Sequence, residues 1–265
     1  MQGLPNIPLA DARPAEAPPL QRLALKGEAQ QWTVSEALNS NQAARLPKWL
    51  PKKFTSAVIS QFYHGEIATL AMCRRLLDGL DDPWARRCIE VQITDESRHA
   101  EAYRTYLADI GDLVPPDPVL SEAYDKALGW TGPPEALIAA FNIVLEGEAL
   151  YALDYLGGWL TCPRFRNLNT RVSRDEARHL AFGRIYLSSR LKRMARDERM
   201  EIHRWLKQLW SQTAFGVLDQ FPIPNALLGR RCRTWMETGW QDHRKALIGI
   251  GLVSDEEARM AEQGS

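Results

Sequence analysis

Residues 95–99 and 175–179 share one pattern, Asp-Glu-x-Arg-His, and the two copies begin 80 positions apart. In both copies the glutamate and the histidine are three residues apart. On a helix, side chains with this spacing leave the same face and point to the same place. A carboxylate and an imidazole that converge in this way can chelate one metal ion. The residues concerned are Glu96, His99, Glu176 and His179.

A further glutamate precedes each motif at the same distance: Glu66 lies 30 residues before Glu96, and Glu146 lies 30 residues before Glu176. Between the two glutamates of each pair, the sequence predicts two helical segments of nearly equal length, each about 20 Å long, joined by a turn that contains proline. The two glutamates of a pair therefore reach the same height on neighbouring antiparallel helices. Two such hairpins packed face to face bring four carboxylates and two imidazoles to one point.

This donor set suits two adjacent iron or manganese ions. Carboxylates are hard oxygen donors that can bridge two cations and neutralise their charge, and imidazole binds iron well. The alternative is that each Glu-x-x-His pair is a surface pair or a structural histidine, which is the usual meaning of a single pair. The chain has five histidines, and two of them occur in the same motif behind equally spaced glutamates. The repetition therefore favours a dimetal site.

The pattern resembles the ferritin-like dimetal carboxylate superfamily, in which two helices each supply a Glu and two others each supply a Glu-x-x-His pair. The similarity covers about residues 55–190. It is greatest to the oxygen-activating branch: multicomponent monooxygenase hydroxylases, the ribonucleotide reductase small subunit and aldehyde-deformylating oxygenases. Leu145-Glu146-Gly147 looks like the third ligand helix of that branch. The resemblance implies an all-α fold, a ferritin-like four-helix bundle with additional N- and C-terminal helices.

The same resemblance implies a non-haem diiron oxygenase, with two iron ions or a mixed manganese and iron centre and with dioxygen as co-substrate. Its reaction would be the oxidation of a small organic substrate by hydroxylation, N-oxygenation or oxidative cleavage. Electrons are expected from a separate ferredoxin or reductase, because the sequence contains no flavin or iron–sulfur motif. The sequence does not identify the substrate.

Other functions remain open. A radical generator like the reductase small subunit is favoured by Tyr103, Trp32 and Asp175. However, the tail of that family carries a relay tyrosine, and nothing aromatic follows Trp240 here. A ferroxidase or iron-storage protein is less favoured, since ferritins are shorter and usually lack two complete motifs of this form. A non-catalytic partner subunit is disfavoured because all six ligands are present.

Glu148 competes with Glu146 as the ligand from the third helix. Two residues correspond to about 200° of rotation on a helix, so both side chains cannot point to the metals. Glu146 is preferred because it keeps the 30-residue spacing. Glu148 is then expected to face a neighbouring helix or solvent.

Asp95 and Asp175 each precede a ligand glutamate, and we expect them to point across the bundle to the histidine of the other hairpin. An acceptor on the second ring nitrogen fixes the tautomer and the angle of a metal-binding histidine. The families that this sequence resembles use an aspartate at that place. Arg98 and Arg178 either neutralise excess carboxylate charge beside the metals or lie on the helix surface.

Residues one helical turn beyond the ligands are expected to line the oxygen and substrate pocket: Tyr103, Leu150 and Gly183. Tyr103 has the position of the radical tyrosine in the reductase small subunit, or it is a pocket wall whose hydroxyl bonds a ligand carboxylate. The missing side chain of Gly183 leaves space for a substrate larger than dioxygen. Trp32 is placed like a tryptophan that passes electrons in that reductase, or it fills the core.

Composition indicates a globular protein with one large helical domain. Lysine plus arginine equals aspartate plus glutamate at 33 each, and this balance argues against nucleic-acid binding or attachment to a membrane by charge. No uninterrupted apolar run approaches the roughly 18 residues of a membrane span, and the N-terminus lacks the apolar segment of a signal peptide. We therefore expect a cytoplasmic protein. A homodimer is also expected, because long apolar helices of such bundles often pair across subunits.

The predicted elements follow from proline positions and helical periodicity. The chain divides into a flexible N-terminal arm, a helical domain and a charged tail, at residues 1–20, 21–240 and 241–265. The ligand helices are predicted over residues 52–80, 83–111, 134–158 and 163–196. Asp82, or Asp81 before it, followed by Pro83 makes a good helix start. Further helices are predicted over residues 20–29, 119–128 and 197–221, the last stopped by Pro222.

Overall fold

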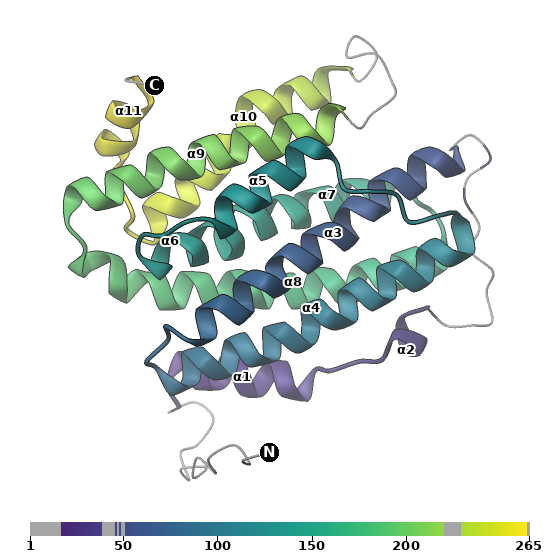
Figure 1. Cartoon of the computed structure of the whole chain (residues 1–265), viewed down its shortest axis with the longest axis horizontal. Helices are drawn as coiled ribbons and strands as arrows, with labels where there is room; N and C mark the ends of the chain where they lie inside the picture. The colour runs from purple at the N-terminus through teal and green to yellow at the C-terminus, as the bar shows by residue number, and fades with distance from the viewer. Residues whose placement is uncertain (1–16, 39–45, 47, 49–50, 220–228, 264–265) are drawn as a thin grey trace.

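A computed structural model describes residues 17–38, 46, 48, 51–219 and 229–263. These residues form helices and connecting loops, with no strand among them (Figure 1). In chain order the elements are α1 (Pro19–Ala29), α2 (Val34–Leu38), α3 (Lys52–Leu77), α4 (Pro83–Ile110), α5 (Pro118–Leu128), α6 (Pro134–Ala139), the π-helix η1 (Ala140–Leu145), α7 (Glu146–Trp159), α8 (Pro163–Arg190), the 3₁₀-helix η2 (Leu191–Arg193), α9 (Arg196–Asp219), α10 (Gly229–Gly249) and α11 (Asp255–Gln263).

The first ligand hairpin consists of α3 and α4, which pack closely against each other. Helix α4 begins as the sequence predicts. Asp82 Oδ1 accepts hydrogen bonds from the backbone nitrogens of Trp84 (2.8 Å) and Ala85 (3.0 Å), and Pro83 occupies the first turn. Proline suits this place because the first N–H groups of a helix have no partner within the helix. The capped start fixes where α4 begins, and therefore the height of its ligands.

The second ligand hairpin pairs the continuous run of α6, η1 and α7 with α8. The sequence predicts one regular helix for that run, but residues Ala140–Leu145 are π-helical and end immediately before Glu146. π-Helical turns are rare in proteins. Those that do occur, mostly as single turns inside α-helices, lie frequently at functional sites. The apolar residues of this segment are compatible with either helix type, so the sequence carries no signal for the wider turn.

This run is also long and apolar enough to cross a membrane, judged by length and composition alone. From Pro134 to Gly158 its mean hydropathy reaches 1.6 over the most apolar window. A search for uninterrupted apolar residues misses it because Glu146 and Glu148 stand inside it. In the structure, 61% of that window is buried inside the molecule. Its apolar character is therefore explained by the core of the bundle, which it lines.

Apolar side chains fill the bundle in two layers, and each ligand helix contributes to both. One layer contains Met72, Ile89, Ile138 and Leu187, and the other contains Ile59, Leu107, Leu153 and Phe165. On every ligand helix the predicted ligands lie between these two sets of positions. The ligands therefore form a polar layer at mid-height of the bundle, as the equal leg lengths predict.

The remaining helices cover the bundle from two sides (Figure 1). Helices α1 and α2 pack against α4 and α8, while α5 packs against α9, and α9 also contacts α10 and α11. The boundary predicted at residue 240 falls inside α10, and α11 buries Ala258 and Ala261 in the apolar core. Residues 241–263 thus belong to the helical packing and do not form a tail. Residues 1–16 of the predicted arm and the predicted stop at Pro222 lie outside the described residues.

Replacing Asp82 with alanine is expected to lower the free energy of unfolding of the metal-free protein by about 1 kcal/mol, because two backbone N–H groups lose their acceptor. Asp82→Asn keeps an acceptor oxygen, so it should lower the free energy of unfolding by only a small part of this amount. Thermal unfolding followed by circular dichroism should show a Tm lower by about 2–4 °C for the alanine variant. An alanine variant as stable as wild type would show that the cap does not stabilise α4.

Candidate metal centre

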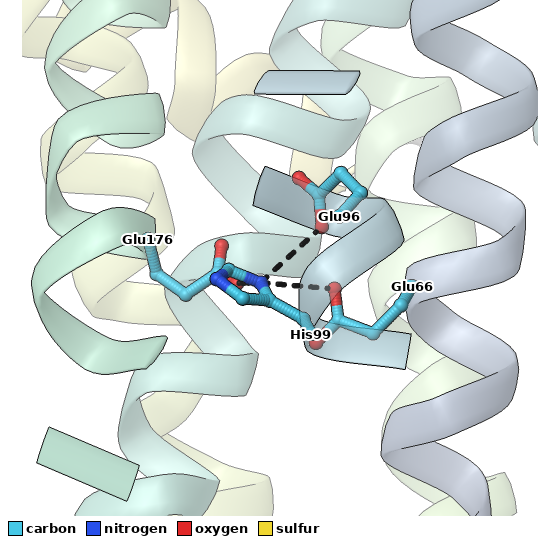
Figure 2. A group of neighbouring side chains, drawn as sticks. All are labelled: Glu66, Glu96, His99 and Glu176. Atoms are coloured by element: carbon cyan, nitrogen blue, oxygen red, sulfur yellow. Dashed lines mark ion pairs between the residues drawn. The ribbon is translucent and has the colours of Figure 1, made fainter. Parts of the chain in front are cut away.

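The six predicted ligands come together in two overlapping groups. The first group is Glu66, Glu96, His99 and Glu176, and the second group is Glu96, Glu146, Glu176 and His179. Within each group, one donor atom per residue lies within 4.8 Å of the others. All six side chains are buried. Figure 2 shows the first group converging from α3, α4 and α8.

Glu96 and Glu176 belong to both groups, and each turns one oxygen to each histidine. His99 Nδ1 lies 3.2 Å from Glu176 Oε1 and 3.6 Å from Glu96 Oε2. His179 Nδ1 lies 3.3 Å from Glu176 Oε2 and 3.2 Å from Glu96 Oε1. Carboxylates that divide their oxygens in this way have the geometry needed to bridge two neighbouring cations.

Glu66 and Glu146 each face one histidine. Glu66 Oε2 is 3.5 Å from His99 Nδ1, and Glu146 Oε1 is 3.7 Å from His179 Nδ1. Burial raises the pKa of both glutamates well above the ordinary value. Burial alone would lower the pKa of the two histidines, but the neighbouring carboxylates raise it well above the ordinary value. Without cations, this cluster must therefore hold protons.

Several donor atoms of the cluster are buried and have no hydrogen-bond partner among the described residues: Glu96 Oε2, His99 Nδ1 and Glu146 Oε2. A buried carboxylate oxygen without a partner is costly unless a cation or a proton satisfies it. Carboxylate oxygens and imidazole nitrogens are donors that iron and manganese accept. The residues therefore fit a centre of two such ions.

Aspartates link the two hairpins crosswise behind the histidines. His99 Nε2 lies 3.3 Å from Asp175 Oδ2, and His179 Nε2 lies 3.2 Å from Asp95 Oδ2, which is the pairing that the sequence predicts. Burial would raise the pKa of both aspartates, but the hydrogen bonds to the histidines, together with the charges of the histidines and of Arg178, outweigh it and hold each pKa well below its ordinary value. Because Nε2 of each ring is engaged, Nδ1 is presented to the ligand cluster.

Arg98 and Arg178 are buried beside these aspartates, so the surface alternative is wrong. Arg98 Nη2 lies 3.0 Å from Asp175 Oδ2, and Arg178 Nη1 lies 3.1 Å from Asp175 Oδ1. Both arginines also pair with Asp95. The two guanidinium groups thus match the charge of the two aspartates. The charge of the four ligand glutamates is left to be balanced by cations or protons.

The segment between α1 and α2 closes this network from outside. Trp32 is buried, its Nε1 donates to Asp175 Oδ2 at 2.7 Å, and its ring stacks on His99 with 5.9 Å between centroids. The tryptophan therefore fills the core and is also bonded to the partner of a candidate ligand. Gln31, which was not predicted as a site residue, donates to Asp95 Oδ1 at 2.9 Å. No spacing signal could have identified it, because it lies in a loop 64 residues from its partner.

Glu148 points away from the cluster, as the rotation argument predicts. Its Oε1 lies 2.5 Å from both Trp210 Nε1 and His243 Nε2. A Cβ at Gly147 would lie 3.1 Å from His243 Cε1, so the glycine lets the imidazole approach α7. Glu148 is therefore engaged by α9 and α10, and Glu146 is the glutamate of α7 that faces the histidine.

The predicted pocket residues differ from expectation in two respects. Tyr103 is fully buried, and its hydroxyl has no hydrogen-bond partner among the described residues, so the predicted bond to a ligand carboxylate is absent. A Cβ at Gly183 would lie 2.9 Å from Asn142 Cβ and 3.0 Å from Ile143 Cδ1. The glycine therefore accommodates η1 and leaves no room there for a substrate. Leu150 is partly buried on α7.

Two buried amides that were not predicted as site residues border the second group. Gln92 Nε2 donates to Glu96 Oε1 at 2.9 Å and to Glu146 Oε1 at 2.6 Å. Asn142 Nδ2 donates to Glu146 Oε1 at 3.1 Å. Each amide lies four residues before a ligand glutamate, the spacing that puts both side chains on one helix face. That spacing is the signal that could have identified them.

A small cavity lies beside the second group, between α1, α4 and α8. Its volume is about 10 Å³, and it is lined by Gln92, Arg178 and His179 on the polar side and by Leu23 and Phe182 among the apolar residues. A space of this size holds about one water molecule, for which these polar groups offer partners. It is too small for an organic substrate.

No protein-family model and no curated protein matches this sequence. Solved structures do match. The R2-like ligand-binding oxidase from Sulfolobus acidocaldarius has 17% identity and a TM-score of 0.55, over 92% of this chain and 93% of that chain. Two variants of an R2-like ligand-binding oxidase with a reconstituted Mn/Fe cofactor each have 15% identity, with TM-scores of 0.58 and 0.56 over 91% and 93% of this chain and 93% of theirs. This chain therefore has the ferritin-like fold of the R2-like ligand-binding oxidases.

Proposed function

We propose that this protein is an oxygen-activating dimetal oxidase that oxidises a small organic substrate. The observation that carries the proposal is the pair of overlapping donor groups in which Glu96 and Glu176 are shared. The Mn/Fe cofactor of two structural neighbours supports it. The ions would be two iron ions, or one manganese and one iron.

The distances support the following assignment of the donors. A first position would be held by Glu66 and His99, and a second position by Glu146 and His179. Glu96 and Glu176 would bridge the two positions, because each has one oxygen near each histidine. When bound and reduced, the two ions supply the electrons and the binding place for the reduction of dioxygen.

The protein's own residues hold and shield this centre. Asp95 and Asp175 fix the ring angles of the two histidines through Nε2. Apolar layers on both sides keep water from the donors. The bonded series of Trp32, Asp175 and His99 offers a path by which an electron could enter from the side covered by α1. We propose a separate ferredoxin or reductase as the donor, and hydroxylation, N-oxygenation or oxidative cleavage as the reaction.

A radical generator like the ribonucleotide reductase small subunit is a second candidate, favoured by one observation. Tyr103 is fully buried, its hydroxyl has no hydrogen-bond partner among the described residues, and burial raises its pKa well above the ordinary value. A phenol in such surroundings is shielded from solvent. Ferroxidase or iron-storage function has no specific observation in its favour.

Metal loading tests the ligand assignment directly. Anaerobic addition of iron to the wild type is expected to give about two ions per chain, with a transient visible absorption after exposure to oxygen. Glu66→Ala and His179→Ala should each bind less metal, because each removes the terminal donor of one position. Glu101→Ala changes an exposed glutamate of the ligand helix α4 and serves as the control. Ligand variants that retain the wild-type metal content would show that the repeated motif is structural.

Metal binding should release protons and should weaken as the pH falls. Burial raises the pKa of Glu66 and Glu146, so the metal-free cluster holds protons that cations must displace. Calorimetric titration with Mn(II) in two buffers of different ionisation enthalpy measures the number released. Glu66→Gln should release about one proton fewer per chain. Binding without proton release would contradict the description of this cluster.

Electron paramagnetic resonance separates the two candidate functions. The oxidase is expected to show no long-lived tyrosyl radical after the reduced, iron-loaded protein meets oxygen. A stable tyrosyl signal in the wild type that is absent in Tyr103→Phe would instead establish the radical generator. The variant keeps the ring that packs 5.7 Å from Phe62 and removes only the hydroxyl, so the bundle should remain folded.

A further inference from the structure

The ligands repeat with an offset of 80 residues, but the residues one helical turn away from them do not repeat in type. Near the second group there are two amides and a glycine, where the first group has two hydrocarbon side chains and a tyrosine. The pairs related by the offset are Asn142 and Phe62, Gln92 and Val172, and Gly183 and Tyr103. The centre is thus symmetric in its donors and asymmetric in its surroundings.

The two amides act together on one oxygen. Glu146 Oε1 accepts hydrogen bonds from Gln92 Nε2 at 2.6 Å and from Asn142 Nδ2 at 3.1 Å. Asn142 Nδ2 also donates to Gln92 Oε1 at 3.1 Å, and Gln92 donates to Glu96 Oε1. The other oxygen, Glu146 Oε2, is buried without a hydrogen-bond partner among the described residues. The two amides therefore hold the oxygen of Glu146 that lies 3.7 Å from His179 Nδ1, and they fix the orientation of the whole carboxylate toward the second position.

The orientation of the amides follows from charge. Turned by half a rotation, each amide would place its own oxygen against carboxylate oxygens, which is repulsive. Both side chains are almost fully buried, at 1% exposure for Gln92 and 0% for Asn142, so water does not compete for these bonds. Gly183 makes the arrangement possible, because a Cβ there would lie 2.9 Å from Asn142 Cβ.

Glu66, the terminal carboxylate of the first group, has no such support. The positions that correspond to Asn142 and Gln92 are Phe62 and Val172, whose side chains have no hydrogen-bond donor. Nothing from these positions can hold one oxygen of Glu66, so this carboxylate can bind through one oxygen or through both. Glu66 and Glu146 are therefore the same residue type, but only the Glu146 carboxylate is held by amide hydrogen bonds from these positions.

We propose that Gln92 and Asn142 are positioning residues that fix the orientation of the Glu146 carboxylate and make the two metal positions unequal. This inference rests on the proposed dimetal function. A donor already held in its binding geometry loses less conformational freedom when the ion binds. The second position therefore fills first and more tightly, while the first position binds more weakly and accommodates changes of coordination.

Titration with Mn(II) alone, followed by the electron paramagnetic resonance signal of the free ion, tests this proposal without turnover. The wild type is expected to bind in two unequal steps. Crystals loaded with less than one equivalent of Mn(II) should show anomalous scattering mainly between Glu146 and His179. Gln92→Met and Asn142→Leu, which keep size and remove the donors, should weaken the tighter step by about 10–100-fold.

Matched controls come from the other half of the centre. Phe62→Leu and Val172→Ala change the positions related by the repeat and should leave the tighter step unchanged. Asn142→Ala also removes the N–H donor and adds no new metal ligand, so it should weaken the tighter step as Asn142→Leu does. Circular dichroism of the metal-free variants checks folding. If the Asn142 variants do not fold, Gln92→Met and the order of filling in wild-type crystals still decide.

Each outcome has a distinct meaning. A wild type that binds no Mn(II) would overturn the proposed function and this inference with it. Two equal steps in the wild type, first occupancy near Glu66, or equal weakening of both steps by Gln92→Met would overturn the inference alone. Full affinity in Asn142→Leu would show that shape, and not hydrogen bonding, is what matters at that position.

Discussion

Burial of four glutamates and two histidines in one layer of an apolar bundle is the constraint on which the rest of the structure depends. Charged groups removed from water must be paired, neutralised or bound to cations. The aspartates behind the histidines are matched by two buried arginines, so this outer layer is balanced within the protein. Among the described residues no arginine or lysine pairs with the four glutamates, so protons, including those on the two histidines, or metal ions must balance their charge. The folded protein must therefore bind metal ions, protons, or both at this cluster.

Because hydrogen bonds cross between the two hairpins, the positions of the two histidines depend on both hairpins being packed together. Asp95 on α4 bonds His179 on α8, and Asp175 on α8 bonds His99 on α4. Neither hairpin alone can hold its histidine at the observed angle, because the acceptor belongs to the other one. Trp32 and Gln31 bond the same two aspartates from the segment between α1 and α2. The N-terminal helices therefore take part in fixing the donors, although they supply none.

The donors and their height were predictable because they depend on local periodicity and on a repeated spacing. Equal legs around a capped turn at Asp82 place two glutamates at one level whatever the packing details. The π-helical turn before Glu146 was not predictable, since its residues suit either helix type. The role of Gly183 was predicted wrongly, because whether a missing side chain leaves a cavity depends on how closely the neighbouring helix approaches. Tertiary contacts decide such questions, and one sequence does not contain them explicitly.

The π-helical turn η1, Gly183 and the amides of Gln92 and Asn142 together make the surroundings of the second group differ from those of the first. The π-helical segment carries Asn142 toward α8, Gly183 gives it room, and the asparagine then reaches Glu146 and Gln92. Buried polar networks are costly unless their polar atoms are bonded. Here the amide N–H groups that face the carboxylates are bonded, while Asn142 Oδ1 is buried without a hydrogen-bond partner among the described residues. Under the proposed function, unequal positions would let one ion change its coordination while the other stays fixed.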